Sequence, residues 1–594
     1  MTMTPIGSNG ERGRIRRRSP WRRMGALTVS AALVLSGCIS IPNSGPVQEG
    51  NGEVPESNPI LPFAEGPKTG DGPTSIVSGF LTASAAGFAS DFSVAREYLT
   101  TEASAKWNPA ARVVVFDSGA LTPEWDESTS TIQYTVPVAA EVDDSGILVE
   151  APDGTREPLN FRLVLDADGE YRIAELDDGA LIAQANFDRL FLPVALAFSS
   201  VDRTTVVPEL RWLPLNNGAT WAARELIEGP SPWLANAVVT GFPAGAALEV
   251  DSVVVTDGIA AVQLNPESAG TPADRSLVQE QLSQTLETLP GVVAVTVTVG
   301  GVALGGDGTV TLDPAPVPDG NAVAIVGGRL GWWDGTDLFV VTDDVGALPR
   351  GSTEIARSFE GPDVAFLVDH TTLAVSSALR EGAGGLIPFS DDLTALEAVM
   401  DYEVMYTGRR LVGPSFDREG WIWTAEAVNA GSFVAVQPGA DAVDIDAPWL
   451  DGRTVQSVTV SRDGARVAIL SREGGQQMTE VASVVRTEQG APLTLGAPVA
   501  VGTDITTAID AHWVDNLSFA ILGEAQDEVP SSLWVTGVGG ETTLESATAG
   551  AVSVTARLGQ SSLTTVGTDG AVRSRVGNGW EEVVTGVDDL AYAG

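Results

Sequence analysis

The nine residues Val460-Ser461-Arg462-Asp463-Gly464-Ala465-Arg466-Val467-Ala468 place a polar turn between two apolar runs. Asp-Gly is a favoured pair for the tight turn of a β-hairpin, because glycine accepts a positive φ. Five more segments combine a polar or glycine-rich turn with an apolar strand: Val326–Trp332, Leu367–Ala374, Phe416–Ile422, Trp513–Phe519 and Arg557–Leu563. The six segments recur at roughly 41–53 residues, the spacing of four-stranded propeller blades. The sequence therefore predicts an all-β propeller of about six blades over residues 320–594.

A smaller unit that mixes helices and strands precedes the propeller. We expect it to span residues 190–305, with a linker at 306–319 that contains Asp313-Pro314-Ala315-Pro316-Val317-Pro318. Periodicity predicts strands over Val194–Ser200, Val206–Leu213, Ala247–Thr256, Ala260–Leu264 and Val292–Val299, and helices over Asn217–Glu228 and Asp274–Leu289. Asp257-Gly258 predicts a tight hairpin turn between two of these strands.

Residues 74–188 predict another small α+β domain. Thr74 or Ser75 can cap a helix that carries Ile76, Val77 and Phe80 at helical spacing. A run of alternating strands follows, with turns at pairs such as Asp153-Gly154. The fold class is therefore multidomain: two small α+β domains followed by an all-β propeller.

The N-terminal 37 residues read as a signal peptide. A stretch with seven arginines between Arg12 and Arg23 precedes a short apolar run, Gly25–Leu35, which is too short to span a membrane. The run ends in Leu35-Ser36-Gly37-Cys38, which contains the only cysteine of the sequence and resembles the bacterial lipobox. The resemblance implies that the Cys38 thiol receives a diacylglyceryl group and that the chain is cut before it. Residues 38–73, which are rich in proline, predict an extended tether.

The charge and cysteine content restrict the partners of the exported part. The sequence has a net charge of −44, and removal of residues 1–37 leaves 27 basic and 77 acidic side chains. Such a surface repels nucleic acid and anionic lipid, so membrane attachment must come from acyl chains at Cys38. With one cysteine, no intramolecular disulfide forms and Cys-rich zinc sites are excluded.

The sequence contains no catalytic, cofactor-binding or metal-binding constellation. The two histidines, His370 and His512, are expected on inter-strand turns of different blades. Acid pairs such as Asp343-Asp344, Asp391-Asp392 and Asp588-Asp589 are expected in solvated turns, and glycine-rich Gly300–Gly306 in a loop. The tryptophans of residues 320–594 are expected to pack inside and between blades. We therefore predict no enzyme activity and no cofactor.

Several stretches resemble known families. Arg224–Pro230, Val253–Gly258 and Val293–Gly301 follow the order seen in the GerMN domain of sporulation and spore-germination proteins. The order of elements in residues 74–188 resembles nuclear-transport-factor-like (NTF2-like) domains, and Ser461-Arg462-Asp463-Gly464 resembles the Ser-x-Asp-Gly turn of many bacterial propellers.

The complete order of lipobox, proline tether, α+β domain, GerMN-like domain and propeller resembles the LpqB family of actinobacterial lipoproteins. The resemblance implies a protein on the outer face of the cell membrane that works with the MtrA–MtrB two-component system. In that family the partner is the extracellular domain of the sensor kinase MtrB, and the effect is on cell envelope and division. Only Cys38 carries over as a site residue. Two other classes stay open: an envelope protein that binds or hydrolyses wall glycan, and a propeller that senses a small ligand.

Overall fold

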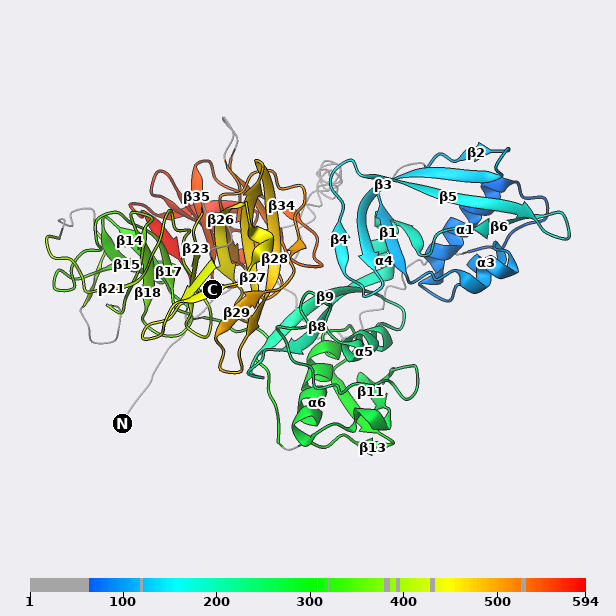
Figure 1. The fold of residues 1–594 in the computed structure, drawn as a ribbon, viewed down its shortest axis with the longest axis horizontal. Helices are drawn as coiled ribbons and strands as arrows, with labels where there is room; N and C mark the ends of the chain where they lie inside the picture. Colours follow the sequence, from blue (N-terminus) through cyan, green and yellow to red (C-terminus); the bar gives the residue numbers. More distant parts are fainter. Residues whose placement is uncertain are drawn as a thin grey trace, which may run out of the picture. The chain divides into compact units, whose positions relative to one another are not determined.

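A computed structural model describes residues 64–117, 121–306, 308–318, 320–378, 385–390, 396–427, 433–524 and 530–594. Cys38 and the residues of the lipobox lie outside the described residues. The chain divides into two units, Met1–Pro59 and Ile60–Gly594, and the second contains all the elements given below (Figure 1).

The first folded module packs helices against a curved sheet. Its strand order is β6-β5-β3-β1-β7, with β1 and β7 parallel. The elements are α1 (Pro73–Gly87), α2 (Ser93–Glu97), α3 (Thr101–Lys106), β1 (Arg112–Phe116), β2 (Glu124–Asp126), β3 (Thr131–Asp143), β4 (Leu148–Glu150), β5 (Arg156–Leu165), β6 (Tyr171–Glu175), β7 (Ala180–Ala183) and α4 (Gln184–Leu190). Ile76, Val77 and Phe80 of α1 are buried against the sheet, which confirms the predicted apolar face. The predicted cap is wrong, because Pro73 opens the helix at a position where its fixed φ fits and no N–H is needed.

The second module places two helices on one face of a mixed sheet with the order β10-β11-β12-β13. Its elements are β8 (Phe191–Ser199), β9 (Val206–Pro214), α5 (Gly218–Glu228), β10 (Val254–Thr256), β11 (Ile259–Leu264), a 3-10 turn (Pro266–Ala269), α6 (Pro272–Leu286), β12 (Ala294–Val299) and β13 (Val302–Ala303). The predicted hairpin turn is confirmed, since Asp257 and Gly258 both have positive φ. The strand before it is shorter than predicted, because only Val254–Thr256 pairs continuously with β11.

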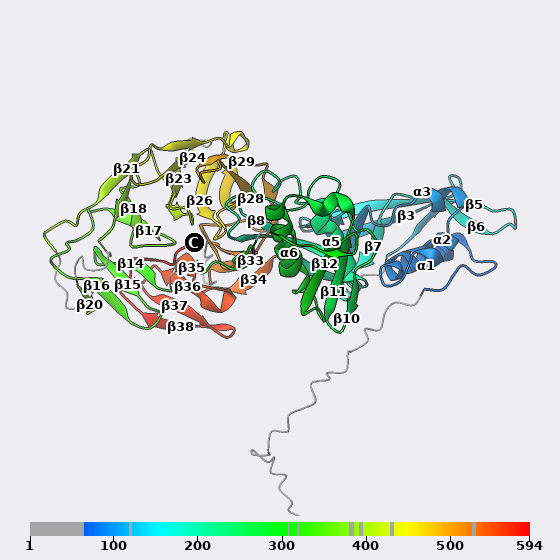
Figure 2. The ribbon, with the colours of Figure 1, turned by 90° about the horizontal axis from the view of Figure 1, so that it is seen from below.

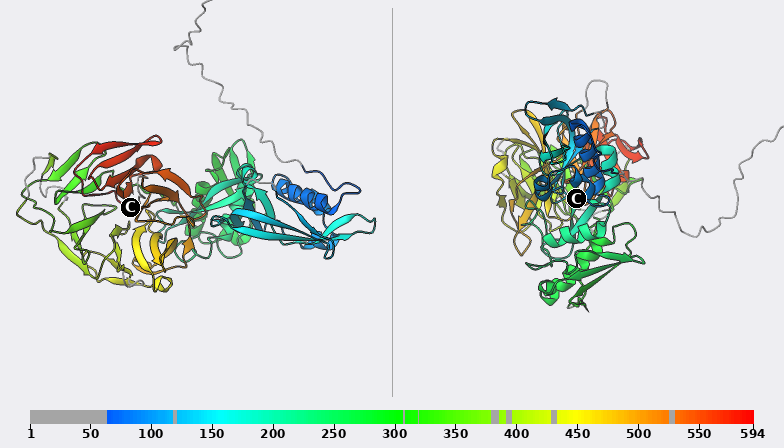
Figure 3. Two further views of the ribbon diagram at one scale, coloured as in Figure 1. Left: turned by 90° about the horizontal axis from the view of Figure 1, so that it is seen from above. Right: turned by 90° about the vertical axis from the view of Figure 1, so that its right-hand side faces the viewer.

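The third module is a propeller of six sheets, as predicted (Figures 2 and 3). The first sheet contains β14 (Ala322–Val326), β15 (Arg329–Trp333), β16 (Leu338–Val341), β20 (Leu386–Pro388) and β39 (Asp589–Ala591); the second contains β17 (Ser352–Arg357), β18 (Val364–Val368), β19 (Thr372–Ser376) and β21 (Glu403–Thr407); the third contains β22 (Ser415–Phe416), β23 (Ile422–Ala425), β24 (Phe433–Val436) and β25 (Val443–Ile445). The fourth contains β26 (Thr454–Val460), β27 (Arg466–Glu473), β28 (Gln476–Arg486), β29 (Pro492–Leu495) and β30 (Val499–Ala500); the fifth contains β31 (Asp510–Trp513), β32 (Phe519–Leu522), β33 (Ser532–Thr536) and β34 (Thr543–Ser546); the sixth contains β35 (Ala551–Ala556), β36 (Leu563–Gly567), β37 (Val572–Val576) and β38 (Gly579–Val584). Short 3-10 turns lie at Pro448–Leu450 and Gln560–Ser562.

The C-terminal strand closes the ring of sheets. β39 pairs antiparallel with β14, so the last strand of the chain is the innermost strand of the first sheet. This pairing covers strand edges that would otherwise stay open. Trp333, Trp423 and Trp513 are at most 1% exposed, which confirms that these tryptophans pack in the blades.

The six repeated segments all lie on hairpins, but not on equivalent ones. Val326–Trp332 and Leu367–Ala374 join the second and third strands of their sheets, counted from the centre. The other four segments join the first and second strands. Each repeated segment therefore marks one blade, but the hairpin on which it lies differs between the first two blades and the other four.

Candidate functional site: the propeller channel

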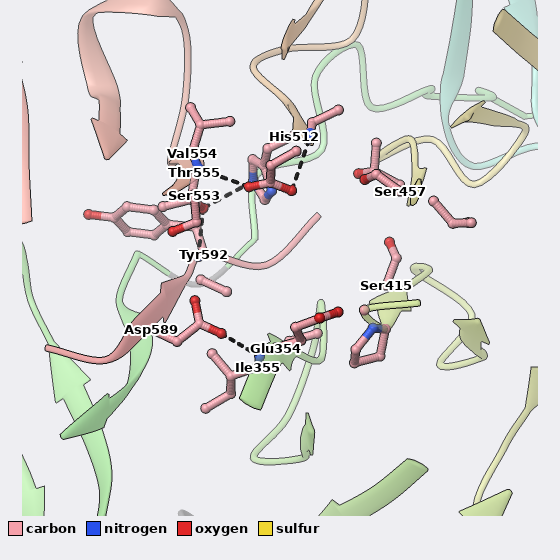
Figure 4. Close-up of a pocket in the computed structure, with 18 of the residues that line it drawn as sticks. Glu354, Ile355, Ser415, Ser457, His512, Ser553, Val554, Thr555, Asp589 and Tyr592 are labelled. Atoms are coloured by element: carbon pink, nitrogen blue, oxygen red, sulfur yellow. Dashed lines mark hydrogen bonds between the residues drawn. The ribbon is translucent and has the colours of Figure 1, made fainter. Parts of the chain in front are cut away.

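The innermost strands of the six sheets surround a cavity of about 240 Å³ (Figure 4). These strands are β17, β22, β26, β31, β35 and β39. Polar side chains from all six strands line the cavity, which we call the channel. It unites residues that are up to 240 positions apart in the sequence, from Glu354 to Gly594.

Side chains in the channel bind the backbone of the next blade at every junction. Four of them accept a backbone N–H from within the following inner strand or from the residue directly after it. These hydrogen bonds are Ile355 N to Asp589 Oδ2 (2.9 Å), Val460 N to Ser415 Oγ (3.0 Å), Val554 N to Asp510 Oδ2 (2.9 Å) and Tyr592 N to Thr555 Oγ1 (3.0 Å). At the two remaining junctions Gln456 Nε2 donates to Ala508 O at 3.2 Å, and the Gly413 N–H donates to Glu354. The ring of bonds fixes the orientation of the polar groups in the channel.

Three carboxylates lie near the starts of their inner strands. Burial and, to a smaller extent, the neighbouring Asp589 raise the pKa of Asp510 to about 7. Burial, then Asp589 and Asp510, raise the pKa of Glu354 to about 7, and burial also raises the pKa of Asp589. Backbone N–H donors oppose these shifts without cancelling them: Asp510 Oδ1 accepts from Ala511 N at 2.9 Å, and Asp589 Oδ1 from Leu590 N at 2.8 Å. The three groups therefore share one partly dehydrated site where negative charge lacks compensation.

The opposite end of the channel is less acidic. Burial, followed by the charge of Arg462, lowers the pKa of His512 to about 3, so this imidazole is neutral at physiological pH. His512 Nε2 lies 3.4 Å from Thr555 Oγ1. Burial also raises the pKa of Tyr592 to about 12, so its hydroxyl stays protonated. His512 and Tyr592 supply neutral polar groups here, and the charged Arg357 at the end of β17 also lines the cavity.

The structure separates the two histidines. His370 lies on the predicted turn, between β18 and β19, with Nδ1 3.2 Å from Glu354 Oε1. The prediction for His512 is wrong, because this residue lies within β31 and lines the channel. An inner strand alternates between channel and core, and the sequence shows this alternation only weakly over four residues. In the described ranges, no group of three or more His, Cys, Asp or Glu side chains is arranged to hold a metal ion.

The acid pairs differ in role. Asp589 lies in the channel, whereas Asp588 Oδ2 accepts the backbone N–H of Gly327 at 3.0 Å. Asp343 Oδ1 accepts from Arg329 Nη1 at 2.9 Å, and Asp391-Asp392 lie outside the described residues. Gly300 and Gly301 form the turn between β12 and β13, as predicted, whereas Val302–Ala303 of the predicted loop form the strand β13. Glu354 and Asp510 were not singled out from the sequence, where each is an isolated acid at or near an apolar strand.

Three domain families match the chain. The family described as Lipoprotein LpqB, N-terminal domain, matches residues 66–188. The family described as Sporulation and spore germination matches residues 195–305, and the Lipoprotein LpqB beta-propeller domain matches residues 356–591. The match over residues 195–305 agrees with the resemblance of this stretch to the GerMN domain.

The chain is also similar to whole proteins of known name and to solved structures. Lipoprotein LpqB of Thermobifida fusca is 28% identical over 566 residues, covering 84% of this chain and 87% of the relative. Lipoprotein LpqB of Cutibacterium acnes is 27% identical over 536 residues, covering 86% and 87%. The first GerMN domain of the sporulation protein GerM from Bacillus subtilis is 18% identical, with a TM-score of 0.17, and the match covers 20% of this chain and 97% of that one. No helix in the described part of the chain is both long and apolar enough to cross a membrane.

Proposed function

Because the chain belongs to the LpqB family of lipoproteins, we propose that it is a membrane-anchored extracytoplasmic modulator of the MtrA–MtrB two-component system. In this proposal it contacts the extracellular domain of the sensor kinase MtrB and thereby affects the cell envelope and division. The observation that carries the proposal is the similarity to named lipoproteins along 84% of the chain, across both α+β modules and the propeller.

The anchor in this proposal is an acylated Cys38. We expect Cys38→Ser to remove palmitate labelling and to move the protein from the membrane fraction to the soluble fraction, because two or more acyl chains are needed for stable attachment. Cell fractionation with labelled palmitate measures both effects. Ser36→Ala, which keeps the thiol and a small side chain beside the cleavage point, is the matched control and should stay with the membrane. Equal labelling of the Cys38→Ser protein would contradict the anchor.

Recognition of the kinase would occur through the folded part of the chain. The acidic surface favours a partner with a basic contact surface, because complementary charge accelerates association and makes it sensitive to salt. We expect the Cys38→Ser protein to retain the extracellular domain of MtrB in a pull-down at micromolar concentration, and to retain less as salt rises. A kinase extracellular domain of unrelated sequence is the control. Absence of retention at low salt would argue strongly against the partner.

The channel supports a second candidate, an envelope protein that binds or hydrolyses wall glycan. Glu354, Asp510 and Asp589 supply the carboxylates that such a site needs. Asp510 and Asp589 each accept two backbone N–H bonds, an arrangement that suits fixed binding groups. Incubation with peptidoglycan and arabinogalactan fragments tests hydrolysis, and turnover that disappears in Glu354→Gln would favour this candidate over the first.

A further inference from the structure

Two carboxylates at the acidic end of the channel have no cationic partner. Among the described residues, no lysine or arginine lies within ion-pair distance of Asp510 or Asp589, and the half-exposed His370 approaches only Glu354. Each of the two carboxylates accepts the N–H of the next residue through one oxygen and an N–H of a neighbouring inner strand through the other. A carboxylate has about four acceptor positions, so each keeps about two for a ligand. Fixed carboxylates without a counter-ion favour a positively charged ligand.

Arg357 also lines the channel, but its guanidinium is bound outside it. Arg357 is 3% exposed, and its Nη1 donates to Asn321 O. Its Cζ lies 4.5 Å from the centroid of the Trp332 ring, and neither Trp332 nor Asn321 lines the channel. The pKa of Asp510 is shifted by burial, backbone donors and Asp589, and by no arginine. The charge of Arg357 therefore does not neutralise the two carboxylates.

A second feature, on the opposite side of the ring, consists of two buried hydroxyl groups. Ser457 is 9% exposed and Thr459 is 5% exposed, and both line the channel from β26. Neither side chain has a hydrogen-bond partner among the described residues, and Figure 4 shows the Ser457 hydroxyl directed into the space between the inner strands. A hydroxyl this deeply buried is costly to leave unpaired. This wall therefore favours a ligand that has hydroxyl groups of its own.

The channel is small and is open to solvent at its acidic end. Val552, which lines it at the start of β35, is 44% exposed. The cavity of about 240 Å³ equals the share of about eight water molecules at roughly 30 Å³ each. This space admits one substituted six-membered ring but no chain of such rings. In the described ranges the carboxylates are not grouped to hold a metal ion, so an ammonium group is the cation that suits them.

We propose that the channel binds one small organic cation that carries a primary ammonium group and several hydroxyl groups, of the size of a single amino sugar. Its ammonium group lies at Asp510 and Asp589, and its hydroxyl groups face Ser457 and Thr459. The negative charge of the chain steers such a cation toward the protein. The site goes beyond the proposed function, since contact with a kinase requires no small ligand.

Three matched compounds test which groups the channel recognises. We expect D-glucosamine to bind the full chain by isothermal titration calorimetry and to raise its melting temperature by mass action. D-Glucose has a hydroxyl in place of the ammonium group, and cyclohexylamine keeps a ring and the ammonium group but has no hydroxyls. Each of these two should bind at least tenfold more weakly than D-glucosamine. No binding of D-glucosamine at 10 mM, or equal binding of either other compound, overturns the proposal.

Variants assign the recognised groups to residues. Asp510→Asn removes one charge and should lower the affinity for D-glucosamine at least tenfold, whereas Asp444→Asn, which changes an exposed acid on β25, should bind as the parent does. Ser457→Ala should lower the affinity about threefold or more. Its matched control is Ser471→Ala, because Ser471 is equally unpaired and buried but does not line the channel.

Unchanged affinity in Asp510→Asn overturns the proposal. If this variant does not fold, as its melting curve without ligand would show, Asp589→Asn and the comparison of D-glucosamine with D-glucose on the parent chain decide. These results are independent of the MtrB pull-down, so failure of one proposal leaves the other standing.

Discussion

Replacement of Arg211 by alanine is expected to destabilise the second module by about 3–5 kcal/mol, because it leaves two buried carboxylates without their cation. The Arg211 side chain is 2% exposed, with Nη2 2.6 Å from Glu209 Oε2 and Nη1 2.9 Å from Glu225 Oε2. Its Nη2 also donates to Gly229 O at 3.1 Å, after the end of α5. The arginine therefore ties β9 to α5. Urea unfolding followed by circular dichroism measures the loss.

The cost should arise from unpaired charge. Burial already raises the pKa of Glu225 to about 7, and Arg211 is the largest factor that opposes this rise. The triple variant Arg211→Met, Glu209→Gln and Glu225→Gln should recover most of the stability, since it removes all three charges at similar volume. Arg224→Ala is the control, because its ion pair with Asp251 is largely exposed and should contribute about 1 kcal/mol or less. Equal losses in Arg211→Ala and Arg224→Ala would contradict the assignment.

The blades were predictable because each one carries its own local signal. A polar turn between apolar strands needs only a few consecutive residues, and the chain repeats this unit six times. The closing strand was not predictable in the same way. Asp589–Ala591 is short and joins the first sheet through a pairing with β14, so its role depends on contact between the two ends of the propeller. Local patterns carry no information on such a contact.

The channel shows the same division between local and long-range information. Asp510 and Glu354 are two among 78 acidic residues, and neither belongs to a recognisable motif. They become a site because six inner strands converge, which is a property of the tertiary structure. Arg462 combines both kinds of information. Its turn was predicted from the local sequence Ser461-Arg462-Asp463-Gly464. Its hydrogen bonds to Trp513 O and Ala556 O could not be predicted, because they join residues far apart in the chain.

The raised pKa of Asp510 should make the propeller less stable as pH increases. In the unfolded chain this carboxyl has an ordinary pKa of 3.8, whereas in the folded chain the pKa is about 7. Between these values the folded state holds more protons than the unfolded state, so the unfolding free energy falls as pH rises and the full loss is present above pH 7. A pKa change from 3.8 to about 7 corresponds to at most about 4 kcal/mol; the backbone donors and partial solvation reduce the expected loss to about 2 kcal/mol.

Asp510→Asn should therefore flatten the pH dependence of stability. Asparagine keeps one acceptor for the N–H of Val554 or Ala511 but carries no charge, so we expect a modest loss of stability at pH 5 and a smaller loss, or a gain, at pH 8. For a domain of this size, 1 kcal/mol corresponds to about 2–4 °C in melting temperature. The difference in melting temperature between pH 5 and pH 8 should accordingly shrink by several degrees relative to the parent. Removing this charge also lowers the pKa of Glu354, for which Asp510 is one of the raising groups, and so adds to the effect. The control Asp444→Asn should leave the pH dependence of the melting temperature unchanged. If both variants change this pH dependence equally, the acidity of the whole surface causes it and the channel carboxylates do not.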